Sequence, residues 1–194
     1  MTLEKKMTDY RTEFDSIGQV KVPKQKYWGA QTQRSLENFK IGSDKIPIIF
    51  IKSFAMQKKA SAISNIALDK LENELGQEII KVCDEIIEGK LDDHFPLSVW
   101  QTGSGTQTNM NLNEVIANKA NLNLGKNLGE YSPIHPNDHC NMGQSSNDSF
   151  PTAMHISISK ITKEKLFPAI NNLIRSLEKK IREFKNIIKV GRTH

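Results

Sequence analysis

A stripe of large apolar side chains repeats at alternating four- and three-residue steps near the end of this 194-residue sequence. Its members are Ile170, Ile174, Leu177, Ile181, Phe184 and Ile188. This heptad spacing places all of them on one face of an α-helix and is typical of helices that pack in bundles. A single helix cannot bury such a face, so partner helices must come from elsewhere in a longer protein or from other subunits. We therefore expect the chain to be the N-terminal part of a longer, mainly α-helical protein.

Upstream, apolar residues recur at three- and four-residue steps in three further segments, each of which predicts a helix. The first begins at about Pro47, the second runs over about 74–88 with Gly89 as its C-terminal stop, and the third begins near Thr108. Before them, Thr12 to Val22 reads as short β-like pieces and predicts a small β ribbon or extended arm.

The remaining segment, Asn121 to Ser149, is rich in Asn, Gly, Ser and Pro and predicts a loop. The longest helix is expected to start near Pro151, with Asp148 or Ser149 as its cap and Pro168 kinking or breaking it. The expected division is 1–144 for an N-terminal domain and 145–194 for the start of a helical bundle.

Composition and charge exclude several classes of protein. The net charge of +5 arises from a mixed-sign run, Lys160 to Lys189, which predicts a solvated helix face and not a nucleic-acid site. The longest apolar stretch, Ile46 to Ile51, is far shorter than the roughly 20 residues of a membrane span. The charged N-terminus argues against a secretory or transit peptide, and Cys83 and Cys140 form no Cys-x-x-Cys pair. We expect a cytoplasmic protein with free thiols that binds neither nucleic acid nor membrane.

Two polar segments precede predicted helices. Thr102 to Asn109 fits neither a P-loop nor a dinucleotide fingerprint, yet its glycines, hydroxyls and free N–H groups at a helix N-terminus suit an anion. Helix capping by Thr106 or Thr108 is the alternative. Gly143 to Asp148 carries more hydroxyl and amide groups than capping needs. Two such sites suit a small dicarboxylate better than a polyphosphate.

A third segment, His135 to Cys140, gathers potential metal ligands. Pro133 and Pro136 exclude a regular helix there, so ligands four residues apart cannot share a helix face. We therefore expect no metal at this segment.

Five motifs together resemble the class II fumarases, in order and in approximate spacing. They are Tyr27–Arg34, Trp100–Thr106, His135–His139, Gln144–Asp148 and Gly191–His194. The resemblance implies a fumarase/aspartase-like fold, in which an N-terminal helical domain with a small β ribbon leads into the first long helix of a central bundle. It also implies a homotetramer whose active sites are each shared by three subunits.

The implied reaction is the reversible anti hydration of fumarate to (S)-malate in the tricarboxylic acid cycle, without metal or organic cofactor. By resemblance, His194 is the catalytic acid/base residue of this chain. The substrate would be bound by Ser104, Gly105, Thr106, Ser145, Ser146, Asn147 and Thr193. A second, non-catalytic dicarboxylate site would use His135, Pro136, Asn137 and Asp138. A catalytic serine loop would lie downstream of His194.

Two alternatives remain open. Ammonia-lyases of the same superfamily typically read Gly-Arg-Thr-Gln at 191–194 and Ser-Thr-Asn-Asp at 145–148, and both positions favour a fumarase here. For residues 1–194 by themselves, a non-catalytic helical association module would explain the heptads, though it leaves the polar loops unexplained.

Overall fold

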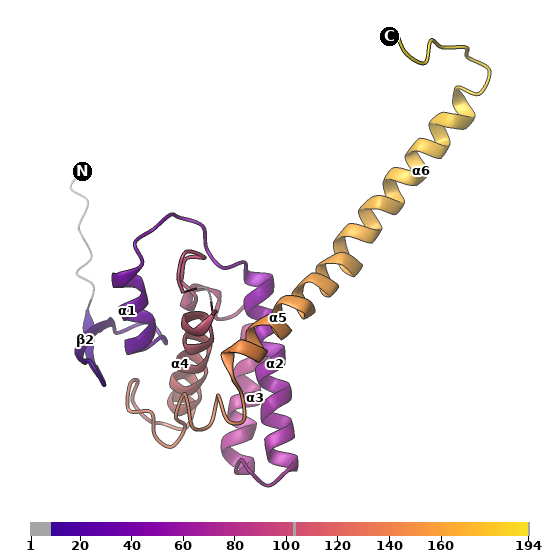
Figure 1. The fold of residues 1–194 in the computed structure, drawn as a ribbon. Helices are drawn as coiled ribbons and strands as arrows, with labels where there is room; N and C mark the ends of the chain where they lie inside the picture. The colour runs from indigo at the N-terminus through magenta and orange to yellow at the C-terminus, as the bar shows by residue number, and fades with distance from the viewer. Residues whose placement is uncertain (1–8, 103, 194) are drawn as a thin grey trace, which may run out of the picture. The chain divides into compact units, whose positions relative to one another are not determined.

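The computed structural model describes residues 9–102 and 104–193. They form two compact units that divide after Ser157. The first unit contains a β hairpin, helices α1 to α4 and most of α5, and the second contains the end of α5 and everything after it (Figure 1). None of the described helices combines the length and the apolar character needed to span a membrane.

The hairpin pairs β1 (Tyr10–Asp15) with β2 (Gly18–Pro23) in antiparallel register, so the β ribbon predicted over 12–22 is confirmed. The Asp15 carboxylate accepts the backbone N–H groups of Ile17 and Gly18 and closes the turn. Val20 and Val22 are buried on the inner face of the hairpin.

The core of the first unit is made by three helices that lie side by side (Figure 1). They are α2 (Ile48–Ala67), α3 (Asn73–Glu88) and α4 (Thr106–Asn123). The predicted starts near Pro47 and Glu74 and the stop at Gly89 are confirmed, and α4 begins two residues before the predicted Thr108. A short 3-10 turn, η1 (Asp92–His94), lies between α3 and α4. The fully buried apolar side chains include Ile51, Phe54, Val82, Ile86, Leu112 and Ile116.

Helix α1 (Ala30–Asn38) was not predicted. Ala30 and Leu36 are the only apolar residues in it, so it shows no apolar repeat. Its first turn contains no acidic residue, and no side chain of its own caps it. Local sequence therefore gives little sign of a helix at this position.

Helix α5 (Ser146–Ile161) begins five residues before the predicted start at Pro151. The predicted caps, Asp148 and Ser149, were wrong, because their N–H groups donate to the carbonyl of Ser145 and belong to the first turn. The Ser145 hydroxyl accepts the Asn147 N–H at 3.2 Å and caps the helix instead. Pro151 lies inside the helix, and the predicted loop shortens to 124–145.

In the second unit, a π-helical turn, η2 (Thr162–Leu166), joins α5 directly to α6 (Phe167–Glu183). Pro168 lies in the first turn of α6 and does not break the helix, because the wider π turn accommodates a residue that has no N–H group. Helix α6 ends at Glu183, so the prediction that the stripe continues on the helix to Ile188 was wrong. The four stripe residues inside α6 are exposed within this chain: Ile170, Ile174, Leu177 and Ile181.

Candidate functional site

Hydroxyl groups from two helix N-termini meet in the first unit. The Ser104 hydroxyl lies 2.9 Å from that of Thr106, the first residue of α4. The Thr106 hydroxyl in turn lies 3.1 Å from that of Ser146, the first residue of α5. The first-turn N–H groups of a helix have no intrahelical partners, and its N-terminus carries partial positive charge. The two converging helices therefore form an accessible site suited to a carboxylate.

Gly105 makes this convergence sterically possible. Its φ is +71°, in the left-handed region that disfavours side chains. A Cβ at this position would also lie 2.3 Å from the Phe150 ring of α5. The Phe150 ring packs against that of Phe50 with 4.7 Å between centroids, which anchors α5 on the core. In the structure, then, Gly105 allows close approach of the two helices.

Capping of α4 differs from the alternative drawn from the sequence. The cap residue is Gly105, and neither Thr106 nor Thr108 caps the helix with its hydroxyl. The side-chain oxygen of Gln101 accepts both the N–H and the hydroxyl of Thr108, each at 3.1 Å. This leaves the Thr106 hydroxyl to face Ser104 and Ser146. Of the other predicted binding residues, Ser145 caps α5 and Asn147 is exposed in its first turn.

Sequence reasoning missed two buried carboxyl groups at the N-terminus of α1. Glu114 of α4 accepts the backbone N–H groups of Gly29, Gln31 and Thr32, and the Thr32 hydroxyl at 2.6 Å. Burial raises the pKa of Glu114 to about 7, although these hydrogen bonds favour the charged form. Glu13 of β1 accepts the Ala30 N–H and pairs with Arg11 at 2.6 Å. No local pattern reveals these contacts, because Glu114 lies in the middle of α4 and its partners lie far away in the sequence.

The predicted second dicarboxylate segment forms a turn, and the expected absence of a regular helix is confirmed. His135 Nδ1 accepts the N–H groups of Asn137 and Asp138, both at 3.3 Å. The same Nδ1 lies 3.2 Å from the Asp138 carboxylate. His135, Pro136 and Asn137 also line a cavity of about 280 Å³ beside Glu114 and Tyr131. Within 9–102 and 104–193, no three His, Cys, Asp or Glu residues are grouped to hold a metal ion.

Two predicted site residues, Thr193 and His194, are not among the described residues of the first unit. Thr193 belongs to the second unit and follows α6 as an exposed residue. His194, the predicted catalytic residue, lies outside the described residues.

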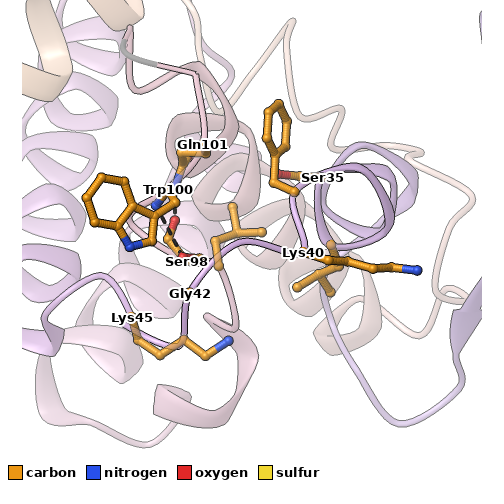
Figure 2. Close-up of a pocket in the computed structure, with 10 residues that line it drawn as sticks. Ser35, Lys40, Gly42, Lys45, Ser98, Trp100 and Gln101 are labelled. Atoms are coloured by element: carbon orange, nitrogen blue, oxygen red, sulfur yellow. Dashed lines mark hydrogen bonds between the residues drawn. The ribbon is translucent and has the colours of Figure 1, made fainter.

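A separate pocket of about 190 Å³ lies where the end of α1 meets the 97–101 segment (Figure 2). Trp100 and Lys40 stand on opposite sides of it in Figure 2. The Lys45 ammonium, also at this pocket, donates to the Pro96 carbonyl. The pocket contains none of the predicted site residues.

Comparison with known proteins gives consistent matches. The lyase family matches residues 18–194. The class II fumarate hydratase of Rickettsia felis is 57% identical over 188 residues, which cover 97% of this chain and 41% of that protein. The class II fumarate hydratase of Campylobacter jejuni is 56% identical over 186 residues, covering 96% and 40%. The chain thus spans about two fifths of the length of these curated relatives.

Comparison with solved structures gives matches to the same kind of protein. The crystal structure of class II fumarase from Schistosoma mansoni superposes with a TM-score of 0.91 at 47% identity, covering 96% of this chain and 39% of that one. A fumarate lyase:delta crystallin structure from Brucella melitensis also gives 0.91, at 41% identity, covering 96% and 44%.

Proposed function

This chain belongs to the lyase family, and from that membership we propose that the whole protein is a class II fumarate hydratase. It would interconvert fumarate and (S)-malate and use no metal or organic cofactor. The observation that carries the proposal is the 3.1 Å approach of the Thr106 and Ser146 hydroxyls at two helix N-termini, an arrangement of donors suited to a carboxylate. The 57% identity to a class II fumarate hydratase supports it.

The proposed chemistry places most of this chain's residues in binding. In malate dehydration a base removes a proton from C3, the adjacent carboxylate takes up negative charge as an aci-carboxylate, and hydroxide leaves C2 as water after protonation. Oriented donors must stabilise that charge, and Ser104, Thr106 and Ser146 would bind a carboxylate of the substrate throughout the reaction. Gly105, Ser145, Asn147 and Thr193 complete the proposed binding set. We assign His194 to the acid/base machinery, since an imidazole pKa of about 6.5 lies near working pH.

The remaining parts of the proposal concern assembly and location. The exposed apolar face of α6 supports a homotetramer in which subunits share active sites. The proposed boundary between the lyase domain and the bundle lies at 144/145, and the proposed location is the cytoplasm. The His135 turn, with Pro136, Asn137 and Asp138, would bind a second dicarboxylate.

The test is an assay of the full-length protein with fumarate, with and without ammonium, following fumarate absorbance and analysing the product. We expect malate and no dependence on ammonium. Formation of aspartate would assign the protein to the ammonia-lyases of the superfamily. Absence of both products would reject the proposed function.

A further inference from the structure

A lysine is buried at the centre of the first unit without an acidic partner. Lys58 of α2 is 1% exposed, and among the residues that the structure describes no carboxylate pairs with it. Its ammonium lies 5.4 Å from the centre of the Phe54 ring and donates to the side-chain oxygen of Asn141 at 3.0 Å. Burying a charge without a carboxylate partner costs stability, so the position of this lysine calls for an explanation.

The Asn141 oxygen is a point where three parts of the fold meet. Besides Lys58 of α2, it accepts the side-chain N–H groups of Asn109 at 3.0 Å and Asn113 at 3.3 Å, both from α4. The side-chain oxygens of Asn109 and Asn113 are themselves buried and lack a hydrogen-bond partner within the described part of the chain. Buried acceptors are usually paired, so these two oxygens call for an explanation.

Asn141 also forms hydrogen bonds with the residues that lead into α5. Its side-chain N–H donates to the Gln144 carbonyl at 3.1 Å, and the backbone N–H of Gln144 donates to the Asn141 carbonyl at 3.0 Å. Gln144 directly precedes Ser145, the cap of α5. On the other side, Asn109 lies one turn after Thr106. The cluster therefore connects the N-terminus of α4 to that of α5.

We propose that Lys58 is a positioning residue: its contact with Asn141 holds the α4 and α5 N-termini at the spacing that lets Thr106 and Ser146 bind one substrate carboxylate. This inference rests on the proposed fumarate hydratase function. A loss of the contact would shift the Ser145–Asn147 turn relative to Thr106 and weaken binding, while the acid/base groups stay in place.

The protonation of Lys58 then matters for binding. Burial lowers its pKa to about 8. The groups that face it are the Cys83 thiol of α3 and the Cys140 thiol of the turn. Burial raises the pKa of Cys140 to about 12 and raises that of Cys83 as well, so both are neutral when Lys58 titrates. Above about pH 8, Lys58 loses its charge and the hydrogen bond to Asn141 weakens.

The experiment uses the full-length protein with Lys58→Met, and Lys59→Met as the control at the neighbouring, more exposed position. We expect Lys58→Met to raise KM for fumarate about 10- to 100-fold with little change in kcat, as displacement of binding groups predicts. Amide hydrogen exchange supplies a second readout that needs no activity. The N–H groups of Asn147, Asp148 and Ser149, which donate to Ser145, should lose protection in Lys58→Met and keep it in Lys59→Met.

A second variant covers the case in which Lys58→Met does not fold. Asn141→Asp places a carboxylate against the ammonium and should move the alkaline rise in KM to higher pH. The positioning role is overturned if KM begins to rise at the same pH in Asn141→Asp as in the wild type. It is also overturned if a folded Lys58→Met keeps both the KM and the amide protection of the wild type. In either case the hydratase assignment stands. If the wild type hydrates no fumarate but protection still falls only in Lys58→Met, the assignment fails and the positioning of the turn stands.

Discussion

The hydroxyl of Thr106 lies 3.1 Å from that of Ser146, although 40 residues separate them in the chain. Each residue begins a helix, so this one contact brings the partial positive charge of two helix N-termini to a common point. A dicarboxylate bound there would receive hydrogen bonds from both helices.

Thr106→Val in the full-length protein should raise KM for fumarate about 10- to 100-fold, because a hydrogen bond to a charged group contributes about 1.5–3 kcal/mol. Steady-state kinetics measures this effect. Thr12→Val, at an exposed position of β1, is the control and should leave KM unchanged. An unaltered KM in Thr106→Val would remove Thr106 from the binding site.

Gly105→Ala should destabilise the protein by about 2–4 kcal/mol, from left-handed strain of about 1–2 kcal/mol and from overpacking against Phe150. Gly125→Ala is a matched control, since Gly125 has a φ of +76° but open space around its Cβ direction. It should show the strain alone. Urea unfolding of both variants separates the two contributions, and equal losses would show that the Phe150 contact is unimportant.

Glu114→Gln should cost about 2–4 kcal/mol at pH 8, because the amide offers a donor where the α1 N-terminus needs an acceptor. Glu74→Gln, on the exposed first turn of α3, should have a much smaller effect. Chemical unfolding would measure both. Similar values for the two variants would contradict the capping role of Glu114.

His94 should make the stability depend on pH. Burial lowers its pKa to about 4, and its Nδ1 accepts the Tyr27 N–H at 3.0 Å. The unfolded chain, with a histidine pKa of about 6.5, binds the proton more readily, so the free energy of unfolding falls as pH drops from about 6.5 towards 4. When the free energy of unfolding is measured across this pH range, it should change less with pH in His94→Gln than in the wild type. An equal pH dependence in the two proteins would show that His94 does not contribute to the change in stability with pH.

Residues 1–194, studied as an isolated chain, should self-associate and show no hydratase activity. The α6 stripe exposes Leu177 and Ile181 by 54% and 69%, and burial of each such side chain contributes about 1.5–3 kcal/mol. Light scattering should detect the association, and Ile174→Lys with Leu177→Lys should reduce it. A monomeric wild-type chain would contradict the bundle interpretation, and turnover by this chain would contradict the divided active site.

Local patterns determined the hairpin, α2 and α3. Their hydrogen bonds join residues close in sequence, and their apolar periodicity coincides with the face that is buried. The heptad stripe likewise predicted α6, although the helix ends at Glu183 and not at Ile188. The polar motifs located Ser104, Thr106 and Ser146 as binding candidates.

Tertiary structure decided the rest. Helix α1 depends on Glu114, a residue more than 80 positions away that supplies the cap its own sequence lacks. The start of α5 at Ser146 depends on a turn held by Asn141, and Asn141 in turn is held by Lys58 and two asparagines of α4. A motif specifies which donors a chain carries, but their separation depends on packing between helices, as with Gly105 against Phe150. The sequence by itself therefore determined which groups are candidates to bind a carboxylate, and only the fold brought two of them within 3.1 Å.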